Sequence, residues 1–127
     1  MNRDERLEWA RTATVEKWAD AVAEVVMGWE KFSNGYNAYL TPWEGKVVLG
    51  ADWNPDSDIG DAWKVLGKIN TLRFSSRQKF LLELQKAISD DTLKSGNLVA
   101  WPDAIFHLKP RDICLAALLV AEEAEQS

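Results

Sequence analysis

The sequence predicts a single mixed α/β (α+β) domain in which several helices accompany a small, mainly antiparallel sheet. The chain has 127 residues, a length that suits one domain. In several stretches apolar residues recur at three- and four-residue steps, which is the period of a helix face. After the first such stretch, Asn34-Gly35 and Pro42-Trp43-Glu44-Gly45 supply turn chemistry beside short β-prone runs, as a hairpin does.

The composition excludes several classes of protein. Hydrophobic residues make up 46% of the chain and charged residues 28%, which is ordinary for a globular domain. The single cysteine (Cys114) and single histidine (His107) exclude a disulfide framework and an intrachain Cys/His zinc site. The net charge of −5 argues against bulk nucleic acid as a partner. The longest apolar run, 113–121, is too short to cross a membrane, so we expect a cytoplasmic protein.

The N-terminal segment 3–27 is predicted to be helical. Asn2 followed by Glu5 is a capping-box pattern. The stretch 12–14 contains two threonines, which favour caps over helix interiors, so it divides this segment into two helices. Gly28 follows the last periodic turn and is the expected C′ glycine.

A hairpin is predicted over 36–53, with 46–53 as its return strand. A helix over 57–69 follows, with Asp56 and Ser57 as its candidate N-caps. The apolar stripe expected to face the core in this helix consists of Ile59, Ala62, Trp63, Leu66 and Ile69.

The second half of the chain predicts two further helices and a strand region. Residues 72–74 are compatible with a short strand, and a helix over 76–89 follows it. A strand region is expected over 98–108. The last helix spans 110–124, begins with a proline at its first position and is apolar on nearly all sides, so we expect it to be buried.

Three stretches resemble the phage ABA sandwich domain family, small proteins of phages and prophages. They are Val26-Met27-Gly28-Trp29, the run from Trp53 through Asn54-Pro55 to Ala62-Trp63, and Pro110 to Leu118. The resemblance implies a sandwich with the sheet between helices, and the cytoplasm of an infected bacterium as the location. It brings no established activity and no catalytic residues. The chain departs from the family in its longer N-terminal segment and in the helix 76–89, where family members often have a hairpin.

No motif indicates catalysis, a cofactor or a metal. The chain has no nucleophile elbow, phosphate-binding loop or zinc-protease pattern. The acidic stretch 52–58 is similar to a calcium loop at first sight. However, Ser57 stands where that loop needs glycine and Trp63 where it needs a bidentate glutamate. We therefore expect a non-enzymatic protein without a metal site.

Seven tryptophans are unusual in a chain of this length. Trp18, Trp29 and Trp63 share periodic faces with aliphatic residues, so we expect them in the core. Trp43, Trp53 and Trp101 lie at turns or strand ends and could stack on a ligand or fill a subunit interface. Trp9 has no predicted place.

A local basic segment contrasts with the acidic chain. Its five bases, with no acid among them, are Lys64, Lys68, Arg73, Arg77 and Lys79. Part of it surrounds a predicted helix N-terminus, which favours anions. The candidate site for a phosphate-bearing ligand comprises Arg73, Ser75, Ser76, Arg77 and Lys79, with Trp53 as the stacking aromatic. The alternative is a solvated basic face paired with acids of another segment or subunit.

Two functions are compatible with this sequence. The first is a non-catalytic phage accessory protein that binds a small anionic ligand, for example by sequestering a nucleotide signal used in host defence. The alternative is a protein–protein interaction module that inhibits or adapts a host or phage protein. The alternative predicts an exposed aromatic patch around Trp43, Trp53 or Trp101. In both cases we expect a homo-oligomer.

Overall fold

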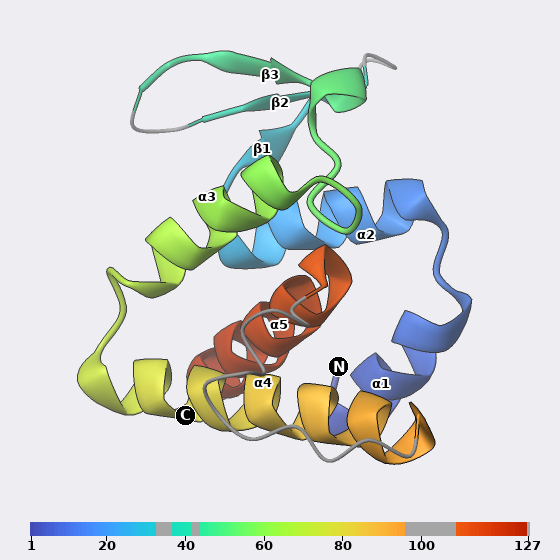
Figure 1. The fold of residues 1–127 in the computed structure, drawn as a ribbon. Helices are drawn as coiled ribbons and strands as arrows, with labels where there is room; N and C mark the ends of the chain where they lie inside the picture. The colour runs from blue at the N-terminus through green and yellow to red at the C-terminus, as the bar shows by residue number, and fades with distance from the viewer. Residues whose placement is uncertain (33–36, 42–43, 96–108, 127) are drawn as a thin grey trace.

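The computed structural model describes residues 1–32, 37–41, 44–95 and 109–126. The elements are α1 (Arg3–Thr12), α2 (Val15–Ala21) with a π-helical continuation η1 (Val22–Val26), β1 (Glu30–Lys31), β2 (Ala38–Leu40), β3 (Val47–Leu49), a 3-10 turn η2 (Gly50–Asp52), α3 (Ile59–Ile69), α4 (Phe74–Ser95) and α5 (Pro110–Gln126). The predicted class, a single α+β domain with a small antiparallel sheet, is confirmed (Figure 1). None of the described helices is long and apolar enough to span a membrane.

Helix α5 runs through the middle of the molecule (Figure 1). It contacts α1, η1, α3 and α4. Its side chains are buried on nearly all sides, as the sequence predicts, and the buried ones are Ile113, Cys114, Ala116, Ala117, Leu118, Leu119 and Val120. Because one helix presents apolar surface in every direction, the other elements are arranged around it.

The predicted helix boundaries near the N-terminus are confirmed. The Asn2 side chain accepts the Glu5 backbone N–H at 2.8 Å, and the Glu5 side chain accepts the Asn2 N–H, which completes the capping box. The Thr14 hydroxyl accepts the Lys17 N–H at 3.3 Å and so starts a second helix. Gly28 ends that helix with a φ of +70°, a conformation that favours glycine.

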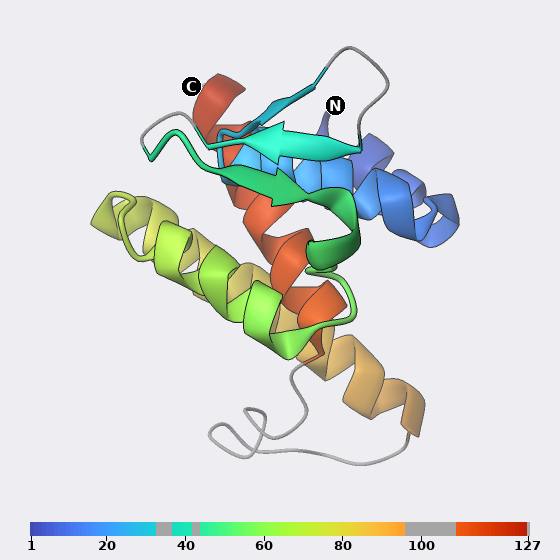
Figure 2. The same ribbon diagram turned by 90° about the horizontal axis from the view of Figure 1, so that it is seen from above.

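The sheet has the order β1-β2-β3 and is antiparallel throughout. Tyr39 stands opposite Lys31 on one side and Val48 on the other. The predicted return strand 46–53 is too long, because β3 stops at Leu49 and a 3-10 turn follows. Figures 1 and 2 show the described helices on one side of this sheet.

Two hydrogen bonds, one buried and one partly buried, join the sheet region to α2. The Tyr39 hydroxyl donates to Asp20 at 2.5 Å, and the Trp53 indole N–H donates to the Ala19 carbonyl at 3.1 Å. Lys31 binds the other Asp20 oxygen at 2.7 Å. Burial, followed by the hydrogen bond to Asp20, raises the pKa of Tyr39 above its usual range.

Four predictions for the chain after the sheet differ from the structure. Helix α3 begins at Ile59, because Asp58 rather than Asp56 or Ser57 is the N-cap. The predicted strand 72–74 is wrong, since tight turns at the end of α3 lead directly into α4 at Phe74. Helix α4 also continues beyond its predicted end to Ser95, and α5 continues to Gln126. The predicted strand region, 98–108, lies outside the described residues.

Substitutions of two tryptophans test this description of the core. Trp53 is 1% exposed and hydrogen-bonded, whereas Trp63 is 63% exposed. Trp53→Ala should therefore lower the free energy of unfolding by about 3–5 kcal/mol, because it leaves a cavity and an unpaired carbonyl. Trp63→Ala should change it by less than about 0.5 kcal/mol. Urea denaturation of both variants is the measurement, and equal losses would contradict the assignment of the two side chains.

Candidate functional site

The most unusual surface of the molecule is formed by α3 and α4. Large apolar side chains of both helices are about half exposed or more, and they are Ile59, Trp63, Phe74, Leu81 and Leu82. Trp63 and Phe74 are the most exposed of these, at 63% and 65%. Contiguous exposed apolar surface on a folded domain commonly marks an interaction site. We call this set the α3–α4 apolar surface.

The predicted core position of Trp63 is wrong for a geometrical reason. The buried apolar residues of α3 are Ala62, Val65 and Ile69. Because successive residues of a helix are about 100° apart, the face that they form points away from Trp63 and Ile59. The predicted stripe did not contain Val65, and a stripe that includes Val65 faces away from Trp63.

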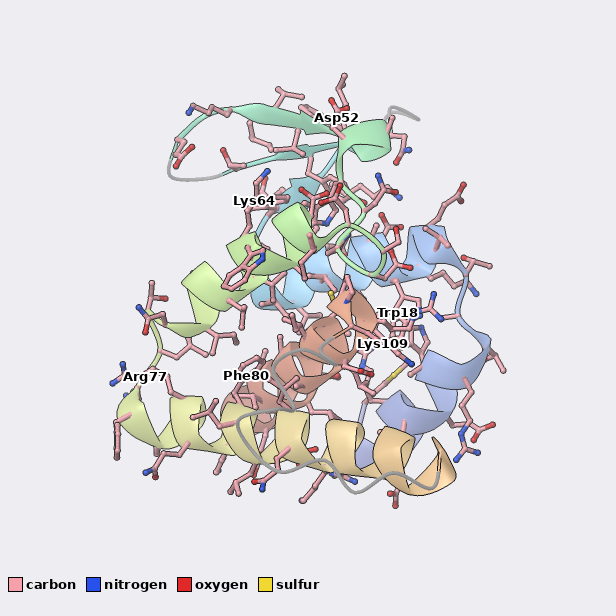
Figure 3. All side chains as sticks on the ribbon, in the orientation of Figure 1. Trp18, Asp52, Lys64, Arg77, Phe80 and Lys109 are labelled. Atoms are coloured by element: carbon pink, nitrogen blue, oxygen red, sulfur yellow. The ribbon has the colours of Figure 1, made fainter. Side chains whose placement is uncertain are left out.

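A groove of about 340 Å³ separates the end of α3 from the beginning of α4. Its walls are mostly apolar and combine Leu66, Ile69, Phe74, Phe80 and Leu81 with the polar side chains of Asn70, Arg77 and Gln78. Phe80 is buried against the core, while Arg77 lies near the start of α4 (Figure 3). Arg77 is therefore the one charged side chain among the residues that line this groove.

Four of the predicted site residues meet at the start of α4. Arg73 directly precedes the helix, Ser75 and Ser76 lie in its first turn, and the Arg77 N–H donates to the Arg73 carbonyl at 3.0 Å. The guanidinium carbon of Arg77 is 5.7 Å from the centre of the Phe74 ring. Its Nε atom is buried and has no hydrogen-bond acceptor.

The other two predicted site residues lie elsewhere. Lys79 pairs with Glu123 of α5 at 3.1 Å. Trp53 is buried beside Trp29, with ring centres 4.6 Å apart, so its predicted role in stacking on a ligand is wrong. Trp9, which the sequence left unplaced, packs on the buried Trp18 with a centre-to-centre distance of 4.8 Å. Trp43 and Trp101 lie outside the described residues, and so does His107.

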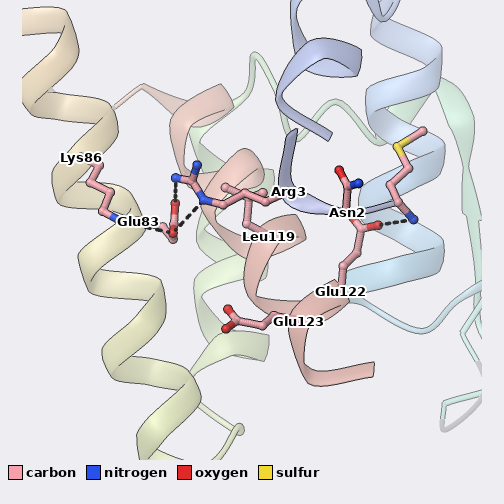
Figure 4. Close-up of a pocket in the computed structure, with 8 residues that line it drawn as sticks. Asn2, Arg3, Glu83, Lys86, Leu119, Glu122 and Glu123 are labelled. Atoms are coloured by element: carbon pink, nitrogen blue, oxygen red, sulfur yellow. Dashed lines mark hydrogen bonds and ion pairs between the residues drawn. The ribbon is translucent and has the colours of Figure 1, made fainter. Parts of the chain in front are cut away.

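A second cavity, of about 380 Å³, lies between α1, α4 and α5 (Figure 4). Its charged groups are largely engaged with each other. Arg3 binds Glu83 at 2.8 Å, and Lys86 lies 3.6 Å from the same carboxylate. No sequence pattern predicts this cavity, because its residues come from three distant segments. Its paired charges indicate a structural role in joining the three helices.

In the acidic stretch that resembles a calcium loop, Asp58 caps a helix and Asp56 forms an ion pair. Asp58 caps α3 by accepting the Asp61 N–H at 3.1 Å, and Asp61 accepts the Asn54 N–H at 2.9 Å. The buried Asp56 pairs with Arg111 at 3.1 Å. In the described residues no group of three or more His, Cys, Asp or Glu side chains could hold a metal ion.

Cys114 has the environment of a structural thiol. It is fully buried in α5, and its Sγ donates to the Pro55 carbonyl at 3.1 Å. Burial, with a smaller contribution from Asp56, raises its pKa from 9.0 to about 12. A buried protonated thiol is a poor nucleophile.

A scan against family models finds the Phage ABA sandwich domain over residues 20–118. This match covers η1, the sheet, α3, α4 and the first half of α5, which contribute most of the buried core residues. The chain therefore belongs to the phage ABA sandwich domain family, as the resemblance in its sequence implied. Helix α1 precedes the matched residues. No curated protein and no solved structure matches the chain significantly.

The raised pKa of Cys114 makes a prediction about alkaline stability. Below pH 9 the thiol is protonated in both the folded and the unfolded chain, so it does not change the free energy of unfolding. As the pH rises past 9, the unfolded chain loses this proton while the folded chain keeps it, which favours unfolding. The free energy of unfolding should fall by about 1 kcal/mol between about pH 8 and 10 through this group. Urea titrations should show a smaller decline in Cys114→Ala, and an identical decline would refute the assignment.

Proposed function

We propose that the protein is a non-catalytic interaction module that binds another protein through the α3–α4 apolar surface. The observation that carries this proposal is the exposure of five large apolar side chains on α3 and α4, of which Phe74 and Leu81 line a groove of about 340 Å³. A monomer gains nothing in stability from such exposure, whereas a partner that covers these side chains gains the hydrophobic free energy of burial.

A protein–protein interaction module is the alternative function that the sequence predicts, but the proposed surface lies at other residues. The sequence favoured a patch around Trp43, Trp53 or Trp101, whereas the exposed aromatic side chains of the described surface are Trp63 and Phe74. Membership of a phage protein family supports a host or phage protein as the partner. Inhibiting or adapting that partner is the corresponding biological role.

Binding of a small anionic ligand is a second candidate, and a specific observation favours it. The buried Nε atom of Arg77 has no acceptor, and it lies close to the first turn of α4, where backbone N–H groups are not used by the helix. A phosphate bound there would accept hydrogen bonds from the Arg77 Nε–H and from these backbone N–H groups. Sequestering a nucleotide signal is the role that this candidate would support.

A capture experiment tests the first proposal. The double variant Phe74→Ser/Leu81→Ser removes apolar surface from the groove, so it should lose partners that the parent chain retains from a lysate of phage-infected host cells. A matched control is Val47→Ser/Leu49→Ser, which removes two equally exposed apolar side chains from β3. Quantitative mass spectrometry of the retained proteins is the measurement. Equal retention by parent, control and groove variant would contradict the proposal.

Calorimetry tests the second candidate. With a panel of cyclic and NAD-derived nucleotides, a binder of small anions should show saturable heat that Arg73→Glu/Arg77→Glu abolishes. Losing a charged hydrogen-bonded contact typically weakens binding by about tenfold or more. The control Lys17→Glu/Lys46→Glu changes the net charge equally at exposed sites outside the groove. Absence of heat across the panel would eliminate this candidate for the nucleotides tested.

A further inference from the structure

The segment that joins α3 to α4 contributes charges of one sign to the α3–α4 apolar surface. Between Asp61 and Glu83 the sequence holds five bases and no acid. Lys64 and Lys79 are already paired, with Asp61 at 3.5 Å and Glu123 at 3.1 Å. Within the described part of the chain, no ion pair joins Lys68, Arg73 or Arg77 to an acid. These three bases are therefore available to an anionic partner.

The shape of the surface is elongated. On α4 the exposed positions Phe74, Gln78, Leu81, Leu82 and Gln85 follow the helical period and form one continuous stripe. At a rise of 1.5 Å per residue this stripe is about 17 Å long, which is roughly three helical turns. On α3, Leu66 and Asn70 line the same groove, and Trp63 precedes Leu66 by three residues on the same helix face.

We infer that the partner presents an acidic amphipathic helix about three turns long to this surface. The inference rests on the proposed function, because it names the chemistry of the partner that the groove would bind. Apolar side chains of that helix, spaced at three and four residues, lie against Phe74 and Leu81, and its carboxylates reach Arg73 and Arg77.

Arg77 is the residue that links the apolar and the charged part of this interface. Its guanidinium lies 5.7 Å from the Phe74 ring centre, and its Nε has no acceptor. A carboxylate approaching over the groove can accept two parallel N–H bonds from such a guanidinium. Desolvation by the neighbouring apolar side chains strengthens this pair relative to one in open water.

A second copy of the chain fits this surface less well. A symmetric dimer brings the same patch of both subunits together, so Lys68, Arg73 and Arg77 of both subunits would lie in one interface. Like charges placed opposite each other oppose association. A partner of opposite charge has no such cost.

Two synthetic helical peptides test the inference directly. Both are 14 residues long by design and carry leucines at the same helical spacing, and they differ only in having Glu or Lys at the flanking positions. Fluorescence anisotropy with the full chain should show binding of the acidic peptide and at least about tenfold weaker binding of the basic one, the equivalent of one favourable charge pair. Arg73→Glu/Arg77→Glu should reverse this preference, and Lys17→Glu/Lys46→Glu should leave it unchanged.

A second variant keeps the inference testable if Arg73→Glu/Arg77→Glu does not fold. Lys68→Glu/Arg73→Glu leaves the partly buried Arg77 in place and should also weaken the acidic peptide, with an unchanged circular dichroism spectrum. Equal affinity for both peptides, or no binding of either, overturns the inference. If the lysate partner still depends on Phe74 and Leu81 in that case, the proposed function stands and only the acidic helix is refuted. Saturable binding of AMP or inorganic phosphate without peptide binding would instead identify a small anion as the occupant.

Discussion

The burial of α5 is the constraint on which the rest of the structure depends. Seven of its residues between Ile113 and Val120 are buried, so this helix needs apolar neighbours in every direction. Helices α1, α3 and α4 and the π-helical turn η1 supply them. Helix α3 buries Ala62, Val65 and Ile69, and α4 buries Phe80 and Leu84, while other apolar side chains of both helices face solvent. The exposed side chains Trp63 and Phe74 are thus surplus to the core.

Ion pairs fix both ends of this buried helix. Near its start, Arg111 pairs with the buried Asp56, and its guanidinium carbon lies 5.3 Å from the centre of the Trp18 ring. Near its end, Glu122 pairs with the buried Arg6 of α1, whose guanidinium carbon lies 4.5 Å from the centre of the Trp9 ring. Removing one partner of a buried pair leaves an uncompensated charge, which is strongly unfavourable. The pairs therefore set the position of α5 relative to the N-terminal helix and to the loop before α3.

Features that depend on local chemistry could be predicted from the sequence. The Asn2 capping box, the break at Thr14, the C′ glycine Gly28 and the buried character of α5 are all confirmed. Features that depend on which face of a helix or strand packs against the core could not be predicted from the sequence. The sequence predicted that Trp53 could contact a ligand because it stands at the end of the predicted strand, and only the tertiary structure directs its indole N–H to Ala19. The groove likewise depends on the turn between α3 and α4, whereas the sequence pattern at 72–74 is compatible with a short strand.

The distribution of charge connects the core to the candidate surface. The chain has five more acids than bases, yet several acids are engaged internally: Asp20 holds Tyr39, Asp56 holds Arg111, and Glu83 holds Arg3. The acidic excess therefore does not neutralise the start of α4. There an arginine with a buried, unsatisfied Nε lies against an exposed phenylalanine. A buried donor without an acceptor costs free energy in the isolated chain, and a carboxylate or phosphate from outside recovers it. The same few residues thus favour both an apolar and an anionic contact, which is the combination that a single amphipathic partner provides.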